Sequence, residues 1–179
     1  WNKVYIMATS LQFIKSSTLT TSASEFLVTD CFNKGYDAYK ILITNEIRSA
    51  TGYGWLRLLD SSGSELSGSY YSGAGLHIYS SSGSTERREP VRTEWKNFIN
   101  YQGKDEPDMG GIEIMMFNPD DSSSYTFFTS QASTHYTGQF LTAAKSIGVY
   151  ANAETVYGIK WYPQSGTING TKISVYGVK

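Results

Sequence analysis

Few residues of this sequence are of the types that catalyse reactions. The chain has two histidines, His77 and His135, and they lie in separate segments. It contains no G-x-S-x-G string, so it offers no nucleophilic serine on the strand-to-helix turn that many hydrolases use. His77 stands in the alternating run Leu76–Ser80, where we expect it on the solvent face of a strand. We therefore predict no catalytic residue and no enzymatic activity.

Acidic residues gather in two predicted loops, where they could act as paired carboxylates or bind a cation. Asp105, Glu106 and Asp108 form one group, and Asp120 and Asp121 form the other. Glycosidases need two carboxylates at a set separation, and Ca²⁺ prefers oxygen ligands. Asn-Pro-Asp-Asp is also ordinary turn chemistry, in which side chains bond to their own backbone. The sequence has no EF-hand, H-E-x-x-H or phosphate-loop pattern, so we predict no metal site and no cofactor.

Two further features of the sequence have structural explanations. Cys31 is the single cysteine, which excludes an internal disulfide, and its apolar neighbours in Val28–Phe32 predict a small buried residue. A fold without disulfides is compatible with a reducing cytoplasm. Asn169–Thr171 matches a glycosylation acceptor, but Asn-Gly is also a favoured hairpin turn, and we predict the turn.

Exposed aromatic side chains are the remaining candidates for a binding site. The sequence holds 14 Tyr, 8 Phe and 4 Trp. Tyr70 and Tyr71 lie in the Gly/Ser-rich segment Gly68–Gly75, and we expect them near the surface, where such rings could stack on a sugar. Trp161 and Tyr162 end a predicted strand. The alternative is that these rings fill the core or a subunit interface, as most aromatic side chains do.

The charge of the chain argues against two classes of partner. The formal net charge is −1 at pH 7, and only 17% of residues are charged. Nucleic acids and anionic membranes both select basic surfaces, so we predict neither as a partner. The most charged segment interleaves three arginines with three glutamates, which indicates a solvated face. These residues are Glu86, Arg87, Arg88, Glu89, Arg92 and Glu94.

Alternating apolar residues and closely spaced Gly and Ser clusters predict strands along most of the chain. We predict them at Tyr36–Glu46, Gly54–Asp60, Leu76–Ser80, Gly111–Asn118, Ser124–Ser133, Ser146–Ala151, Thr155–Tyr162 and Thr171–Lys179. The fourth and fifth of these flank a strong turn and form a predicted hairpin. About ten short strands joined by turns indicate a jelly-roll-like antiparallel β-sandwich. The chain length fits one all-β domain over residues 1–179.

Three segments give weaker signals. Thr85–Lys96 is interrupted by Pro90, and we expect an exposed loop that leads into a strand at Trp95–Tyr101. Phe140–Gly148 has the composition of a short helix. The N-terminal segment shows neither a signal peptide nor an apolar stretch long enough to span a bilayer. The chain opens on Trp1, which leaves the completeness of its N-terminus open.

Five strings of the sequence are distinctive: Ala8–Lys15, Val28–Phe32, Tyr36–Thr44, Ser122–Ser133 and Glu154–Lys179. They resemble small structural proteins of marine tailed bacteriophages of the podovirus-like kind. The resemblance covers most of the chain, and its closing Ile-Ser-Val-Tyr-Gly-Val-Lys is similar to the last strand of many phage β-sandwich domains. The middle of the chain, residues 63–110, matches no motif of these proteins.

The resemblance implies a non-enzymatic virion component that is made in the host cytoplasm. Its partner would be the major capsid protein or another virion protein, and its role that of a capsid decoration or head-fibre protein. By analogy with other phage decorations and fibres, we expect a homo-oligomer, and a trimer in particular. The alternative is a tail-associated module that binds a receptor or a host surface glycan. The resemblance carries over no catalytic residue.

Overall fold

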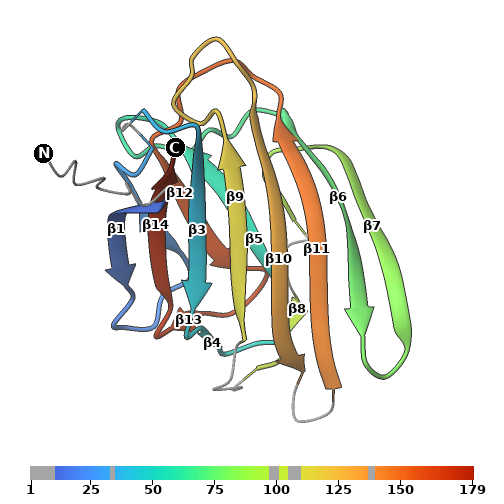
Figure 1. The fold of residues 1–179 in the computed structure, drawn as a ribbon. Coiled ribbons are helices and arrows are strands. Elements are labelled where there is room, and N and C mark those ends of the chain that lie inside the picture. The colour runs from blue at the N-terminus through green and yellow to red at the C-terminus, as the bar shows by residue number, and fades with distance from the viewer. Residues whose placement is uncertain (1–10, 33–34, 97–100, 105–109, 137–139) are drawn as a thin grey trace, which may run out of the picture.

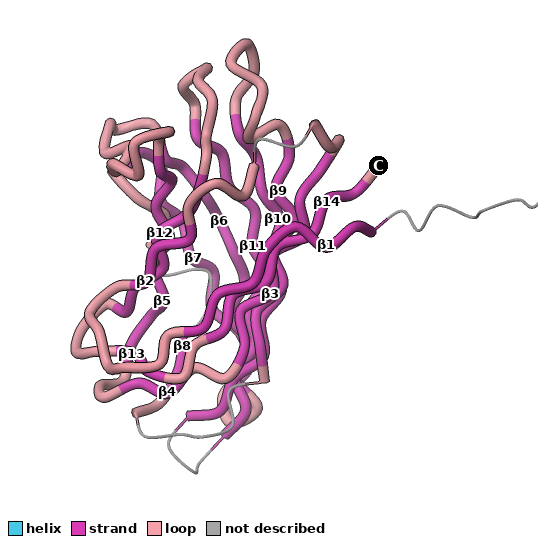
Figure 2. The backbone as a smooth tube through the Cα atoms, turned by 90° about the vertical axis from the view of Figure 1, so that its left-hand side faces the viewer, coloured by secondary structure: helices cyan, strands magenta, loops and turns pink. Residues whose placement is uncertain are grey.

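The computed structural model of the protein describes residues 11–32, 35–96, 101–104, 110–136 and 140–179. Within these ranges every regular element is a β-strand, and every pairing between strands is antiparallel (Figure 1). The strands form two layers that face each other, as the side view in Figure 2 shows. The protein is therefore an all-β antiparallel sandwich, as the sequence predicts.

The larger layer is a sheet of eight strands, called the large sheet here. The first and last strands of the described chain, β1 and β14, pair at one edge, and the β6–β7 hairpin forms the other. The strands in spatial order are β1 (Leu11–Thr18), β14 (Lys172–Val178), β3 (Ala38–Thr44), β9 (Gly111–Phe117), β10 (Thr126–Tyr136), β11 (Phe140–Tyr150), β6 (Tyr71–Tyr79) and β7 (Gly83–Arg92).

The smaller layer, called the small sheet here, has four strands and covers part of the large sheet (Figure 2). A two-stranded ladder closes one end of the sandwich. The small sheet consists, in order, of β2 (Phe26–Val28), β12 (Gly158–Pro163), β5 (Gly52–Leu59) and β8 (Tyr101–Gln102). The ladder joins β13 (Ile168–Asn169) to β4 (Ile47–Arg48).

The core lies between the two sheets and follows from the period-two alternation of their strands. In β3, Ile41 and Ile43 are fully buried, and in the facing β5 so are Leu56 and Leu58. Trp161 of β12 is the largest side chain of the small sheet in this core. Burying each aliphatic side chain of this size contributes about 1.5–3 kcal/mol, so the alternation fixes which face of each strand points inward.

Toward β11 and β6, the inner face of the large sheet carries small residues. Ser130 of β10, Ser146 of β11 and Gly75 of β6 line up across three strands. A Cβ atom at Gly148 would collide with the rings of Phe128 and Trp95, so glycine leaves the space that Trp95 fills. Trp95 and Phe128 pack edge to face at 4.6 Å between ring centroids. Small residues in the sheet thus make room for a large ring from a connecting segment.

A buried ion pair lies near the two-stranded ladder. The side chains of Glu46 and Arg48 are both fully buried, and Arg48 Nε donates a hydrogen bond of 2.6 Å to Glu46 Oε1. Trp161 Nε1 donates to the other carboxylate oxygen, and Gln102 Nε2 donates to the Glu46 carbonyl at 2.9 Å. Arg48 Nη1 reaches the Gly52 carbonyl at 2.6 Å. These five residues, called the buried cluster, link β4, β5, β8 and β12.

The strand predictions are confirmed where the alternation is clear. Phe127 of β10 pairs with Phe117 of β9, so the predicted hairpin forms across the turn. In β5, Trp55 and Arg57 share one face, and the buried Leu56 and Leu58 share the other. Gly63 has φ of +80° in the turn after β5, the conformation for which glycine is suited. The described chain has fourteen strands in place of about ten, because several are only two or three residues long.

Two predictions about secondary structure are wrong. The segment Phe140–Gly148 is not a helix but belongs to strand β11, whose residues pair with β10 on one side and β6 on the other. The charged segment from Thr85 is not a loop, because β7 extends to Arg92 along the edge of the large sheet. In both cases cross-strand pairing overrides local propensity. The predicted strand at Trp95–Tyr101 falls mainly outside the described residues; Trp95 itself bridges to Leu56.

Candidate functional site

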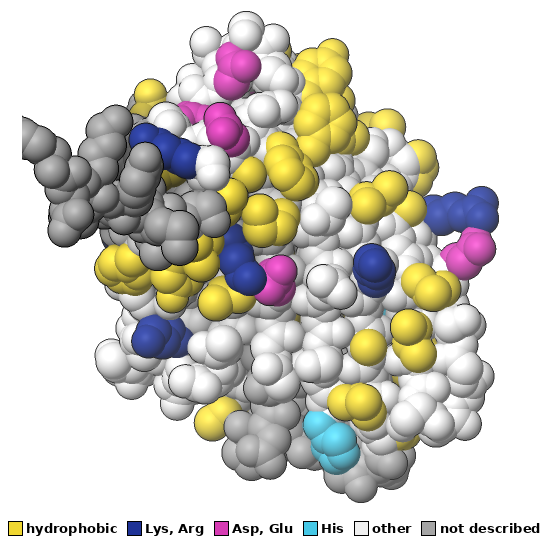
Figure 3. All heavy atoms as spheres, viewed as in Figure 1, with side chains coloured by type: hydrophobic (Ala, Val, Ile, Leu, Met, Phe, Trp, Pro, Cys, Tyr) yellow, Lys and Arg dark blue, Asp and Glu magenta, His cyan; other side chains and the backbone are white. Residues whose placement is uncertain are grey.

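The outer face of the large sheet, which points away from the small sheet, is one candidate binding surface (Figure 3). Much of its charge is internally paired. Lys40 Nζ lies 2.8 Å from Glu113 Oε2, and Arg88 Nη2 lies 2.5 Å from Glu86 Oε2. Apolar side chains lie between these ion pairs, so a partner on this face would meet neutralised charge and hydrocarbon.

An apolar hollow of about 690 Å³ lies on this face, over β10, β11, β6 and β7. Two of the side chains that line it are well exposed to solvent, Ile147 at 61% and Phe127 at 44%. Exposed apolar clusters of this kind mark surfaces at which another molecule docks. Its apolar lining includes six side chains, called the outer apolar patch here: Ala74, Pro90, Phe117, Phe127, Ile147 and Val149.

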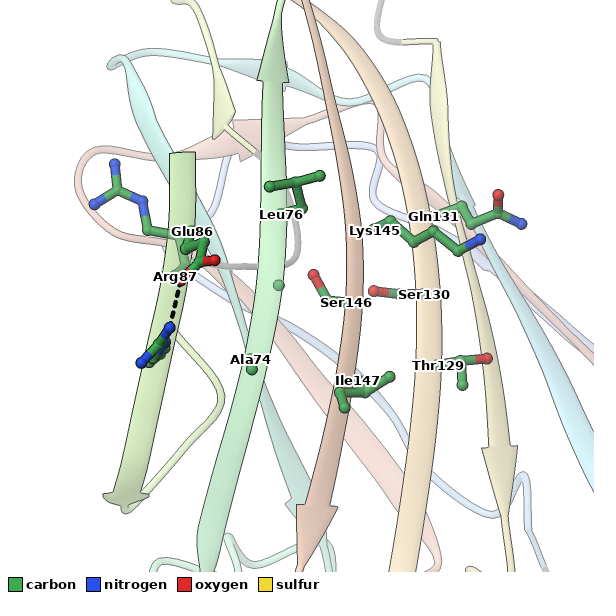
Figure 4. A pocket seen from close by; sticks show the side chains of 12 residues that line it. Ala74, Leu76, Glu86, Arg87, Thr129, Ser130, Gln131, Lys145, Ser146 and Ile147 are labelled. Carbon is green, nitrogen blue, oxygen red and sulfur yellow. Dashed lines mark hydrogen bonds and ion pairs between the residues drawn. The ribbon is translucent and has the colours of Figure 1, made fainter. Parts of the chain in front are cut away.

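A second hollow of about 660 Å³ continues the outer apolar patch along the same strands (Figure 4). It shares Ala74 and Ile147 with the patch, and its other walls include Leu76 of β6, Gln131 of β10 and Lys145 of β11. Amide and ammonium groups therefore border the patch on this side. The two hollows form one continuous surface that is apolar at one end and polar at the other.

The other candidate surface is a cleft of about 710 Å³ between the small sheet and the edge of the large sheet. Four aromatic side chains form part of its walls. The rings of Tyr53 and Tyr101 lie 4.7 Å apart at 56°, and those of Tyr79 and Phe140 lie 6.2 Å apart at 75°. Gln164 adds an exposed amide, whose Oε1 accepts a hydrogen bond of 3.3 Å from the Tyr53 backbone N–H. We call this site the aromatic cleft.

Arg87 of β7 brings a positive charge to the aromatic cleft. Its Cζ lies 5.4 Å from the centroid of the Tyr53 ring. Burial raises the pKa of Tyr53 to about 12, and the neighbouring Tyr79 hydroxyl adds to the shift, while Arg87 opposes it. The Tyr53 hydroxyl therefore keeps its proton at neutral pH and can both donate and accept hydrogen bonds.

A third group of side chains, called the sheet-surface cluster, covers the exposed face of the small sheet. Arg57 pairs with Glu65 and Glu94, and Lys160 pairs with Glu65 and, at 2.7 Å, with Glu25. Lys96 also pairs with Glu94. The Lys96 ammonium lies 4.5 Å from the Trp55 ring centroid, and that of Lys160 lies 4.8 Å from Tyr162. The opposite charges compensate one another, so this cluster holds the sheet surface together and offers no excess charge to a ligand.

The histidines and the cysteine do not form a reactive site. His77 was expected on the solvent face, but it is buried on the inner face of β6, opposite Ala144, so that prediction is wrong. His135 lies next to inward-facing Thr134 and so points to the other side of the same sheet. Cys31 is fully buried as predicted, and burial raises the pKa of its thiol to about 12. The thiol is consequently protonated and unreactive.

The acidic residues of the turn after β9 bond to protein groups, as the turn prediction states. Asp121 Oδ1 accepts hydrogen bonds from the Ser123 N–H at 2.8 Å and the Ser123 hydroxyl at 2.6 Å. Asp120 Oδ2 accepts from the Tyr39 hydroxyl at 2.8 Å. The other predicted group, residues 105–109, lies outside the described ranges. Within those ranges, no three His, Cys, Asp or Glu side chains converge as metal ligands would.

The predicted aromatic candidates separate into core and surface residues. Tyr71 is fully buried, and its hydroxyl donates to the Leu66 carbonyl at 2.6 Å, so its expected place at the surface is wrong. Tyr70 is exposed and packs edge to face on Tyr150 at 5.9 Å. Trp161 fills the core, whereas Tyr162 lies half-buried on the sheet-surface cluster.

The interleaved charges of β7 are only partly solvated. Glu86, Arg88 and Arg92 are exposed, as predicted for the whole run, but Glu89 and Glu94 are buried. At the predicted Asn-Gly turn, Gly170 has φ of +67°, and its N–H donates to Asn169 Oδ1 at 2.8 Å.

Sequence reasoning missed the aromatic cleft, whose residues come from β5, β6, β7, β8 and β11. Tyr53 and Tyr101 meet because Tyr53 of β5 is paired with Tyr101 of β8, across 48 positions of the chain. The alternation of β7 places Arg87 and Arg88 on opposite faces. That alternation was the one signal in the sequence that could have separated the two arginines.

The fold defines the class of this protein as an antiparallel β-sandwich. No protein-family model matches the sequence, and no curated protein sequence matches it significantly. Among solved structures, the exo-inulinase of Aspergillus awamori is similar with a TM-score of 0.41 and 11% sequence identity, over 93% of this chain and 29% of that chain. The protein thus spans less than a third of this neighbour's length. In the described residues, no helix is long and apolar enough to cross a membrane.

Proposed function

We propose that the protein is a non-enzymatic structural component of a bacteriophage particle, a capsid decoration or head-fibre protein attached to the major capsid protein. The observation that carries the proposal is the outer apolar patch, a hollow of about 690 Å³ with Phe127 and Ile147 exposed. The sequence strings that resemble phage structural proteins support the choice of a virion protein as its occupant. The copies of the protein are proposed to form a homo-oligomer, a trimer in particular.

The chemistry of the outer face supports a protein as the partner. Its ion pairs Lys40–Glu113 and Glu86–Arg88 neutralise each other, so the patch selects apolar, uncharged surface. The major capsid protein repeats across a lattice, and a contact through the outer apolar patch can be repeated with it.

The first experiment is the copy number of the protein in purified particles, measured by quantitative mass spectrometry against the major capsid protein. A ratio near unity or a simple fraction is expected for a decoration protein that covers the lattice. Absence of the protein from purified particles would contradict the proposal.

A matched pair of variants tests the patch itself. Ile147→Asp places a charge at its centre, whereas Leu27→Asp places one on an exposed apolar residue of β2 in the small sheet. We expect Ile147→Asp to abolish incorporation into particles and Leu27→Asp to leave it unchanged, with both variants folded by circular dichroism. Normal incorporation of Ile147→Asp would exclude the patch as the attachment surface. If Ile147→Asp prevents the purified protein from forming its homo-oligomer but does not prevent incorporation, the patch is a contact between copies of the protein.

A second candidate function is a tail-associated module that binds a receptor or a carbohydrate, and the aromatic cleft favours it. A few copies per particle, in place of a lattice-wide number, would select this function. Attachment and ligand binding would use different surfaces, since Arg87 faces the cleft and Arg88 the outer face.

A further inference from the structure

The aromatic cleft has the dimensions and lining of a site for a small ring-shaped ligand. Its volume of about 710 Å³ falls within the range of about 300–1,000 Å³ that small-molecule sites occupy. Tyr53, Tyr79, Tyr101 and Phe140 supply the apolar wall, and Gln164 and Arg87 supply polar groups. Such a combination of broad apolar faces with a few directed polar groups suits a sugar residue, which has one apolar C–H face and a rim of hydroxyls.

The polar groups of the cleft favour a ligand with a negative charge. Arg57, Arg48, Arg88 and Arg92 all make hydrogen bonds or ion pairs, but Arg87 alone among the described arginines makes neither with any described residue. Its Nε is buried without an acceptor in the described structure. The described residues that line the cleft include no Asp or Glu. Arg87 is therefore an unneutralised cation whose planar donors fit a carboxylate.

The ring of Tyr53 contacts Arg87, and the rings of Tyr53 and Tyr101 could also contact the ring of a ligand bound beside Arg87. The Tyr53 ring lies under the Arg87 guanidinium and beside the ring of Tyr101. Since the pKa of Tyr53 is raised to about 12, its hydroxyl is neutral and does not compete for the guanidinium as an anion. The Gln164 amide, fixed through its oxygen by the Tyr53 N–H, is positioned to bond a sugar hydroxyl through its NH₂ group.

We propose that the aromatic cleft binds a sugar residue that carries a carboxylate, such as a uronic acid, with its carboxylate on Arg87 and its ring against Tyr53 and Tyr101. This inference refines the second candidate function by naming the ligand class. It does not depend on where in a particle the protein resides. A negative copy-number experiment would not contradict the proposed sugar site. Failure of the protein to bind the sugar would not contradict the proposed structural role.

The test is a chemical-shift titration of the full chain with methyl β-D-glucuronide and, in parallel, with methyl β-D-glucoside. Charge-assisted hydrogen bonds lead us to expect that the wild-type protein binds the glucuronide at least about tenfold more tightly. The shifted resonances should include those of Tyr53 and Tyr101. Equal affinity for the two sugars would overturn the assignment of the carboxylate to Arg87, and no binding of either sugar would overturn the site.

A matched pair of variants separates Arg87 from general charge effects. Arg87→Gln removes the cation in the cleft, and Arg88→Gln removes the adjacent cation on the opposite face of β7. We expect Arg87→Gln to abolish the preference for the glucuronide and Arg88→Gln to retain it. Equal behaviour of the two variants would contradict the proposal. If Arg87→Gln does not fold, the wild-type comparison of the two sugars still decides the outcome.

Discussion

The buried cluster and the sheet-surface cluster both join opposite charges across strands, but they differ in what surrounds them. Glu46 and Arg48 have no exposed side-chain surface. Besides their mutual ion pair, the Glu46 carboxylate accepts a hydrogen bond from the indole N–H of Trp161, and the Arg48 guanidinium donates one to the Gly52 carbonyl. Arg57 and Glu65 remain partly open to water, and their charges are shared among several partners. The first cluster should therefore depend on every member, whereas the second should tolerate the loss of an exposed member such as Glu65.

The largest effect is expected when the buried pair is broken. Glu46→Gln leaves the Arg48 guanidinium buried without its counter-charge, which should lower the free energy of unfolding by about 3–5 kcal/mol. Urea unfolding followed by tryptophan fluorescence measures the change. Glu113→Gln, which breaks the open Lys40 pair, is the matched control, and a similar loss in both variants would refute the distinction between buried and open pairs.

An intermediate effect is expected at Glu94, the most buried carboxylate of the sheet-surface cluster. Its side chain is only 4% exposed and accepts hydrogen bonds from Arg57, Thr93 and Lys96. Glu94→Gln should cost about 1–3 kcal/mol, because a neutral amide replaces the charged carboxylate and leaves its donors one acceptor oxygen in place of two. Glu86→Gln, in the exposed pair with Arg88, serves as the control. An unchanged urea midpoint for Glu94→Gln would mean that its donors find other acceptors.

The pH dependence of the free energy of unfolding should reflect the ionisation of Glu94. Burial alone would raise the pKa of Glu94, but hydrogen bonds from Lys96, Arg57 and Thr93 outweigh it and lower the pKa from 4.5 to about 2. Its contribution is therefore complete above about pH 4.5 and is lost as the pH falls toward 2. Burial raises the pKa of Glu89, which acts in the opposite direction. The difference in urea midpoint between wild type and Glu94→Gln should therefore shrink between pH 5 and pH 2, and a constant difference would argue against the lowered pKa.

The smallest effect is expected at Glu65, which is partly exposed and bridges Arg57 and Lys160. Glu65→Gln should cost less than about 1 kcal/mol, because Arg57 keeps Glu94 and Lys160 keeps Glu25. Thermal unfolding at low and high salt measures the change. The double variant Glu25→Gln/Glu65→Gln removes both partners of Lys160 and should lose more than the sum of the two single changes. Strict additivity would show that these charges act independently.

The sequence predicted those parts of the fold in which side chains alternate strictly. Ile41 and Ile43 in β3 and Leu56 and Leu58 in β5 have a period of two, and this alone identifies both the strand and its buried face. The run Phe140–Gly148 has helix-forming Leu, Ala and Lys, and only its pairing with β10 and β6 makes it a strand. Nothing local in the sequence records that pairing.

The candidate sites could be predicted less well than the fold. Tyr70 and Tyr71 are adjacent among Gly and Ser residues, and no apolar alternation around them indicates that Tyr71 points inward. Tyr53, Arg87 and Tyr101 lie far apart in the sequence and meet only because β5 pairs with β8 and β7 forms the neighbouring edge. A site that is assembled by tertiary pairing leaves no local motif in the sequence.

The pairing of β1 with β14 places the first and last described strands side by side at one edge of the large sheet. Leu11 lies opposite Val178, so a short peptide could join these two positions, and new ends could be opened in the turn between β6 and β7 without deleting a strand. A gene rearranged in this way would keep every ladder between the described strands. It would also move the point of fusion from one edge of the large sheet to the other. The domain is thus a natural candidate for circular permutation, with either edge available as the point at which a foreign sequence is displayed.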